Sequence, residues 1–157
     1  PPDAPVVPDA GALRDALRRG LEAHLGPLIE QLCAHLGCKP RGLWLSAADR
    51  CAGTLIWLMQ ARAADRAQIE AELDALVRAP DSPLSSRQIG LIELGHGGRS
   101  QLFLNRATCC YWYKTEGGDY CDTCPRLRPE ERRARLLASL AAQAVGAGAL
   151  VEEEAVA

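Results

Sequence analysis

Residues 109–124 read Cys-Cys-Tyr-Trp-Tyr-Lys-Thr-Glu-Gly-Gly-Asp-Tyr-Cys-Asp-Thr-Cys, and this stretch holds four of the seven cysteines in the chain. An adjacent pair, Cys109 and Cys110, is followed after ten residues by Cys121 and Cys124, which enclose two residues. Four thiolates at this density usually bind zinc or an iron–sulfur cluster. Disulfides or free thiols are the remaining interpretation.

The spacing of the four cysteines bears on which ligand they bind. A structural zinc site is usually built from two Cys-x(2–4)-Cys knuckles, because the turn of each knuckle directs both sulfurs at one ion. Here Cys121 and Cys124 form such a knuckle, and the adjacent pair does not. In an extended or irregular backbone, Cys109 and Cys110 point in different directions, which suits two metal centres better than one ion. The residues alone favour a [2Fe–2S] cluster over zinc and leave both open.

Length, charge and composition limit the class of protein. The chain has 157 residues, which is typical of one domain with its own hydrophobic core. Its net charge of −2 gives no overall field that attracts nucleic acid, so we expect no nucleic-acid partner. The longest apolar run, residues 52–59, is far too short for a transmembrane segment. An odd number of cysteines with an adjacent pair is a poor disulfide framework and favours a reducing, cytoplasmic setting.

The N-terminal half of the chain carries the pattern of helices. Leucines recur at helical spacing over residues 13–36. Gly26-Pro27 interrupts this stripe, so we expect two helices that meet there, the second ending at Gly37.

Two more helices are expected before the sequence changes character. Ser46 is expected to cap the third, with Asp49 at the acidic position of a capping box. The fourth is expected over residues 64–79, with Pro80 beyond its end.

After Pro83 the apolar residues occur in short, strand-like runs. Residues 88–94 and 101–105 are joined by Gly95-His96-Gly97-Gly98, which predicts a β-hairpin with a longer glycine loop. A final helix is expected with Pro129 in its first turn. The expected fold class is α+β and mainly α, with four N-terminal helices, one β-hairpin, a cysteine-rich cluster loop and a C-terminal helix.

The expected organisation has three parts. Residues 1–8 form a flexible lead-in, residues 9–146 form a single helical domain, and residues 147–157 form a frayed acidic tail. Within the domain, the cluster segment covers residues 106–126. Four aromatic residues of this segment are expected to form a small satellite core: Tyr111, Trp112, Tyr113 and Tyr120.

The residues around the cysteines resemble those of one protein family. Arg106-Ala-Thr precedes the adjacent pair, an aromatic residue follows it, glycines lie in the connecting loop, and Pro125 follows the last cysteine. This arrangement, Cys-Cys-x10-Cys-x2-Cys, is similar to the C-terminal signature of the FhuF-type ferric-siderophore reductases. The resemblance extends from the hairpin through Pro125.

The resemblance implies a function for the site. It implies that a [2Fe–2S] cluster passes one electron to the Fe(III) of a ferric siderophore, and that Fe(II), which the siderophore binds far more weakly, is then released. The sequence shows no convincing catalytic triad, dinucleotide fingerprint or Walker loop. Electrons are therefore expected from a separate donor, a ferredoxin or a flavoprotein reductase. The cluster ligands that the resemblance implies are Cys109, Cys110, Cys121 and Cys124.

Cationic residues flank the cluster segment and are candidates for docking an anionic chelate or an acidic donor protein. The alternative interpretation is that they are solvated surface residues. These candidates are Arg99, Arg106, Lys114 and Arg126.

Two other functions fit the same cysteines. One is a zinc-stabilised interaction domain, and the other is an iron–sulfur electron carrier or sensor without siderophore activity. Away from the segment, Cys33, His35 and Cys38 allow a second metal site, although buried thiols and a surface histidine fit them better. Cys51 lies on an apolar helical face and is expected in the core.

Overall fold

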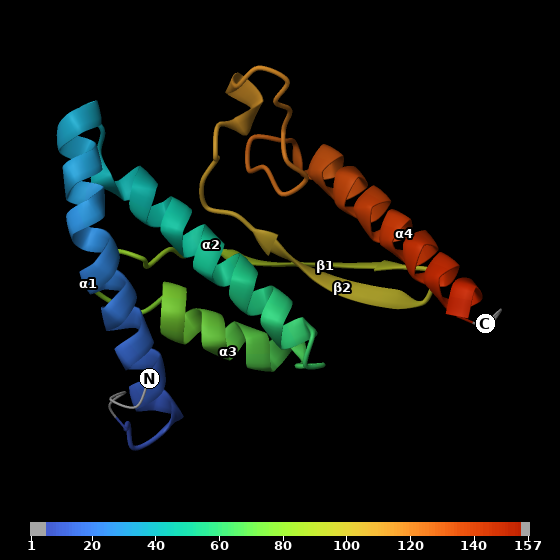
Figure 1. Ribbon diagram of the computed structural model, residues 1–157, viewed down its shortest axis with the longest axis horizontal. Coiled ribbons are helices and arrows are strands. Elements are labelled where there is room, and N and C mark those ends of the chain that lie inside the picture. Colours follow the sequence, from blue (N-terminus) through green and yellow to red (C-terminus); the bar gives the residue numbers. More distant parts are fainter. Residues whose placement is uncertain (1–5, 155–157) are drawn as a thin grey trace.

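The computed structural model describes residues 6–154, and it describes side chains over residues 6–143. In Figure 1 the N-terminal helices lie together, a long β-hairpin lies beside them, and a C-terminal helix lies on the far side of the hairpin. The fold class is the expected one, α+β and mainly α. Its elements are α1 (Ala10–Leu36), α2 (Pro40–Gln60), α3 (Arg66–Val77), β1 (Gly90–His96), β2 (Arg99–Asn105), the short 3-10 helix η1 (Trp112–Lys114) and α4 (Pro129–Glu154).

Both ends of the chain extend beyond the described residues. Residues 1–5 of the expected lead-in lie outside them, and the first helix begins at Ala10. The backbone of α4 stays helical through Glu154, so it continues into the tail expected at residues 147–157. Residues 155–157 lie outside the described chain. Within residues 6–154, no helix has both the length and the apolar character needed to cross a membrane.

The expected break at Gly26-Pro27 is wrong, because α1 runs through Pro27 without interruption. A proline inside a helix removes one backbone hydrogen bond, and the strong helix formers on both sides keep the others. The ends of α1 agree with the sequence. The backbone N–H of Ala12 donates to Asp9 Oδ1 over 2.8 Å at the start, and Gly37 adopts a left-handed conformation at the end, with φ of 62°.

The start predicted for the next helix is also wrong. Helix α2 begins at Pro40, so Ser46 and Asp49 lie inside it and form no cap. Proline at the first helical position is favourable because its missing N–H would have no partner there. The helix predicted over residues 64–79 is present as α3, two residues shorter at each end. A reciprocal capping box of Asp65 and Gln68, which was not predicted from the sequence, starts it.

The two strands form one antiparallel ladder from Gly90 opposite Asn105 to His96 opposite Arg99. The turn is shorter than the glycine loop predicted. It consists of Gly97 and Gly98, with φ of 56° and 77°, a conformation that suits the twist of a hairpin and favours glycine at both positions. Strand β2 leads directly to the cysteines, as expected.

The hydrophobic core lies where α2, α3 and the hairpin meet. Helix α4 covers β1 with buried Leu136 and Leu140. Helix α1 adds Ile29, while the leucines of its stripe remain largely exposed, Leu36 at 70%. Burial therefore concentrates on ten residues, Ala48, Ala52, Ile56, Ile69, Leu73, Leu76, Val77, Leu84, Ile89 and Leu102.

One polar side chain joins α2 to the outer edge of β2. The Nε2 group of Gln60 donates to the carbonyl oxygen of Leu102 over 3.0 Å, and Gln60 Oε1 accepts from the N–H of Leu102 over 2.8 Å. The amide thus satisfies both backbone groups of one edge residue.

Candidate metal centre

The cysteine segment, residues 106–126, lies between the end of β2 and the start of α4. In Figure 1 it rises above the hairpin, between α2 and α4. Its first residues are fixed by Asp49 of α2, whose side chain is 1% exposed. Asp49 Oδ1 accepts from the N–H of Ala107 over 2.8 Å, and Oδ2 accepts from the N–H of Thr108 over 3.0 Å. Arg106 Nε lies 3.4 Å from the same Oδ2.

Asp49 is the residue whose role the sequence did not reveal. The capping-box interpretation placed it at a helix start, where an acid needs no distant partner. Its neighbours in sequence offered one hint, because Ala48, Ala52 and Ile56 form a buried helical face on which an isolated carboxylate requires hydrogen-bond donors.

The four cysteines of the segment lie in two pairs. Cys109 Sγ is 3.8 Å from Cys124 Sγ. Cys110 and Cys121 share a different neighbour, Arg106, whose Nη1 lies 3.5 Å from Cys121 Sγ and whose guanidinium also acts on Cys110. The adjacent cysteines therefore belong to different pairs, as their expected divergence requires.

The two pairs have different electrostatic surroundings. The backbone N–H of Trp112 and the guanidinium of Arg106 lower the pKa of the exposed Cys110 thiol. Burial raises the pKa of the Cys124 thiol, and the nearby Cys109 adds to this rise. Cys110 is thus placed to carry negative charge, while Cys124 is held in a drier place.

Local backbone geometry creates these positions. Tyr111, directly after the adjacent pair, is in the left-handed region with φ of 58°. The N–H of Cys124 donates to the carbonyl oxygen of Cys121 over 2.8 Å, which closes the knuckle turn. Gly118 passes so close to the carbonyl oxygen of Trp112 that a Cβ there would clash.

The donor set fits an iron–sulfur centre. An all-cysteine [2Fe–2S] cluster takes two thiolates on each iron, and this segment supplies two sulfur pairs. Donors reach the sulfurs, since the N–H of Tyr111 lies 3.4 Å from Cys109 Sγ. The fit concerns sulfur pairs and not a single-ion site, because among the described residues no three or more His, Cys, Asp or Glu side chains are arranged around one metal ion.

The aromatic residues of the segment do not form the satellite core that we expected. Tyr111 and Trp112 are 50% and 57% exposed. Tyr113 and Tyr120 stack on each other with ring centroids 4.5 Å apart. Two of the four aromatic residues are therefore exposed, and the other two are half-buried.

The structure separates the four cationic candidates. Arg106 lies at Asp49 and Cys121, as described above. Lys114 Nζ and Arg126 Cζ lie 5.2 Å and 5.3 Å from the centroid of the Tyr111 ring, so both occupy the outer surface of the segment. Arg99 lies at the hairpin turn, at the opposite end of β2 from the cysteines, about 20 Å along the strand.

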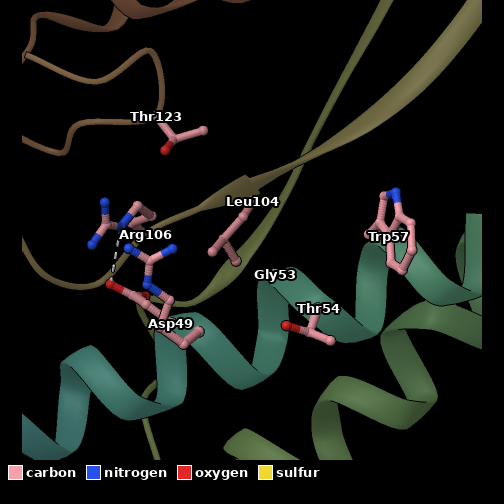
Figure 2. Close-up of a pocket in the computed structure, with 8 residues that line it drawn as sticks. Asp49, Gly53, Thr54, Trp57, Leu104, Arg106 and Thr123 are labelled. Atoms are coloured by element: carbon pink, nitrogen blue, oxygen red, sulfur yellow. Dashed lines mark hydrogen bonds and ion pairs between the residues drawn. The ribbon is translucent and has the colours of Figure 1, made fainter.

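A groove of about 370 Å³ opens beside the Cys121–Cys124 knuckle. Figure 2 shows Thr54 and Trp57 on α2, Leu104 on β2, and Thr123 of the cysteine segment facing the same space, with Arg106 at its end. Arg50 also lines the groove. Among the residues that the structure describes, no cysteine lines the groove, but Thr123 lies inside the Cys121–Cys124 knuckle and Arg106 contacts Cys121 Sγ. A molecule in this groove would therefore lie close to the knuckle.

The remaining cysteines lie elsewhere. Cys51 is half-buried, and burial raises the pKa of its thiol. Cys33 and Cys38 lie at the junction of α1 and α2 with their sulfurs 3.2 Å apart. His35 does not complete a three-residue metal site with them among the described residues.

Comparison with known protein families identifies the cysteine segment. Residues 106–126 match the family model described as the FhuF 2Fe-2S C-terminal domain. The matched residues coincide with the cysteine segment and confirm the resemblance seen in the sequence. The cofactor of this segment is accordingly a [2Fe–2S] cluster. Comparisons with curated proteins and with solved structures gave no match.

Proposed function

We propose that this chain, whose cysteine segment matches a FhuF 2Fe-2S domain, is a ferric-siderophore reductase that transfers one electron to the bound Fe(III) and so releases Fe(II). The observation that carries the proposal is the groove beside the Cys121–Cys124 knuckle. It offers a place for an iron chelate next to the cluster ligands, which is what electron transfer without a nucleophile or general base requires.

The proposal assigns the cluster to Cys109, Cys110, Cys121 and Cys124. When bound, the cluster supplies a one-electron reductant for the chelated iron. Cys109 and Cys124, whose sulfurs lie 3.8 Å apart, and Cys110 and Cys121, which share Arg106 as a neighbour, would hold the cluster. Arg106 and the N–H of Trp112 counter the negative charge on the second pair, which favours the reduced state.

The lining of the groove suits a ligand rich in oxygen acceptors. Arg50, Thr54 and Thr123 present N–H and O–H donors. The one carboxylate, Asp49, already accepts hydrogen bonds at both oxygens. Trp57, 67% exposed, offers an apolar plate beside these donors. Siderophores hold Fe(III) through oxygen atoms, so a ferric chelate matches the groove in chemistry.

The electron donor is proposed to be a separate ferredoxin or flavoprotein reductase. Lys114 and Arg126, together with the exposed rings of Tyr111 and Trp112, form a cationic and aromatic surface on the segment. Such a surface suits an acidic partner protein. Arg99 has no part in this proposal, because of its distance from the cysteines. Seven free cysteines suit a reducing compartment, and we place the protein in the cytoplasm.

The test begins with anaerobically purified protein. We expect two irons and two acid-labile sulfides per chain, and an EPR signal from a [2Fe–2S] cluster after reduction with dithionite. The reduced protein is then mixed with ferric hydroxamate, catecholate and carboxylate chelates. We expect the cluster to be reoxidised at a rate that saturates with chelate concentration, while a ferrous-specific dye detects released Fe(II).

A matched pair of variants tests the groove. Arg50→Gln should raise the chelate concentration needed for half-maximal rate, since it removes a donor from the groove. Arg19→Gln, an exposed arginine of α1, should leave the rate unchanged. A colourless protein that holds one zinc ion would contradict the proposal, because the reductase activity depends on the [2Fe–2S] cluster.

A second candidate is an iron–sulfur electron carrier, and the exposed cationic and aromatic surface favours it. A carrier would reduce ferric chelates without saturation and without preference among them. The zinc-stabilised interaction domain is set aside, because the matching family is a 2Fe-2S domain.

A further inference from the structure

Two thiols outside the cysteine segment lie close enough for an oxidant to join them in a disulfide bond. Cys33 Sγ and Cys38 Sγ are 3.2 Å apart, whereas the sulfurs of a disulfide bond are about 2.05 Å apart. Cys38 is exposed and Cys33 is half-buried, so molecules in solution can reach the pair. Neither cysteine belongs to the segment that matches the 2Fe-2S domain.

The backbone at the end of α1 brings the thiols together. Cys33 lies in the last turn of α1, and the helix ends at Leu36. Gly37 then takes a left-handed conformation with φ of 62°, which reverses the chain and places Cys38 back against that turn. The contact is therefore built into the helix end, and α2 begins two residues later at Pro40.

We propose that Cys33 and Cys38 form a redox-active dithiol, which a small-molecule disulfide such as oxidised glutathione converts reversibly to an intramolecular disulfide. The site is independent of the cluster and of the proposed reductase activity. Disulfides in a reducing compartment are usually of this transient, redox-sensing kind.

The reaction proceeds by two exchanges. The Cys38 thiolate attacks one sulfur of glutathione disulfide, which gives a mixed disulfide and releases one glutathione thiolate. The Cys33 thiolate then attacks the Cys38 sulfur, forms the protein disulfide and releases the second glutathione. Two protein thiols are oxidised, and their two electrons and two protons appear on the two glutathione thiols. Cys38 is the first nucleophile because it is exposed, and because contact with Cys38 raises the pKa of Cys33.

Oxidation would change the junction between α1 and α2. In the dithiol form the end of α1 is poorly covered, with Leu32 49% and Leu36 70% exposed. A covalent bond from the last turn of α1 to the residue before Lys39-Pro40 would restrain the opening of this corner. We expect slower amide exchange over residues 33–42 and a Tm higher by several degrees.

The direct test uses the holoprotein in anaerobic glutathione buffers of increasing oxidised fraction, followed by alkylation and tryptic digestion. Trypsin should leave the bond before Pro40 intact and release residues 20–41 as one peptide that contains both thiols. We expect this peptide to lose two hydrogens and to resist alkylation. Cys51, a half-buried thiol, serves as the internal control and should react on the order of ten times more slowly.

Single variants separate the two steps. In Cys33→Ser, Cys38 should keep glutathione as a stable mixed disulfide, because no second thiol is present to displace it. In the double variant Cys33→Ser/Cys38→Ser, oxidised glutathione should change neither amide exchange nor Tm. The proposal is overturned if the unaltered protein keeps glutathione on Cys38, if residues 20–41 form disulfides only between chains, or if the peptide stays reduced in the most oxidising buffer.

Discussion

The layer of α2, α3 and the hairpin and the cysteine segment are kept folded by different interactions. In the layer, Ile69, Leu73 and Val77 have no exposed surface, and aliphatic packing supplies the stability. In the segment, residues 106–126, Cys124 is the one buried residue. Hydrogen bonds to Asp49, together with bonds to the cluster, must therefore stabilise the segment in place of the packing that stabilises the layer. We therefore expect the layer of α2, α3 and the hairpin to fold before the metal site is complete, whereas the cysteine segment needs the cluster to fold.

Loss of one cysteine ligand from the segment should have the strongest consequence for the protein. Cys121→Ala should remove most of the iron, because it takes one of four thiolates from the proposed ligand set. The helical circular dichroism of α1–α3 should persist, since Ala107 is the one segment residue among the described hydrophobic side chains packed against their core. Visible absorption and iron analysis measure the first effect, and far-ultraviolet circular dichroism measures the second.

Cys51→Ser is the control, since its thiol lies outside the segment and should leave the iron content unchanged. Loss of the helical signal together with the iron in Cys121→Ala would show that layer and segment fold as one unit, and would contradict the comparison.

Truncation of a core side chain should destabilise the layer and leave the cysteine segment intact. Leu73→Ala removes a fully buried side chain and should lower the free energy of unfolding by about 2–5 kcal/mol. Below the unfolding transition the cluster spectrum should stay the same, because Leu73 belongs to the core of the layer and none of the four cysteines of the described segment packs against that core. Urea unfolding gives the stability. An altered spectrum in the folded variant would mean that core packing reaches the cluster.

A smaller effect tests the link between the two regions. Asp49→Asn keeps the shape of the side chain but replaces one acceptor oxygen with a donor, so one backbone N–H loses its partner. We expect a loss of about 1–3 kcal/mol and faster amide exchange at Ala107 and Thr108. A shift of the cluster reduction potential should accompany it, since Arg106 loses its anchor near Cys121.

Asp74→Asn is the matched control for Asp49→Asn, since that carboxylate is 64% exposed and lies in α3. An unchanged potential in Asp49→Asn would mean that Arg106 is held by the segment itself. A slowed or unchanged amide exchange at Ala107 would contradict the anchoring role of Asp49.

The smallest effect concerns the attachment of α1 to the layer. Arg14 lowers the pKa of Glu72, so the ionised carboxylate stabilises the fold at neutral pH. This stabilisation is present above the ordinary pKa of glutamate and is lost as the pH falls through the lowered value. Glu72→Gln should therefore weaken the protein slightly at neutral pH and match the parent in acid. Urea titrations at both pH values test this, and a difference that grows in acid would contradict it.

Local signals in the sequence predicted much of this structure. Helical spacing with Pro80 beyond its end predicted α3, Gly37 predicted the end of α1, and short apolar runs predicted both strands. The errors arose where several local preferences compete. Pro27 reads as a helix break, but the flanking helix formers outweigh one lost hydrogen bond. Ser46 reads as a cap, but Pro40 starts the helix earlier.

The cysteine ligands of the site could be predicted from the sequence, but the hydrogen bonds from Asp49 that hold the segment could not. The spacing of the cysteines identified the segment because all four lie close together in the chain. Asp49 was missed because its partners, Ala107 and Thr108, lie 58 and 59 residues away, and only the tertiary fold brings them together. The groove was missed for the same reason, since its walls come from α2, β2 and the segment.

The two hydrogen bonds between Gln60 and Leu102 bear on how readily the chain aggregates at high concentration. A two-stranded sheet exposes backbone groups along its outer edges, and such edges recruit strands from other molecules. Gln60 occupies the donor and the acceptor of Leu102, so the middle of the β2 edge is closed to an incoming strand. A single side chain thus provides this protection. It prevents intermolecular pairing of the strand that leads to the cysteines before the segment has bound its metal.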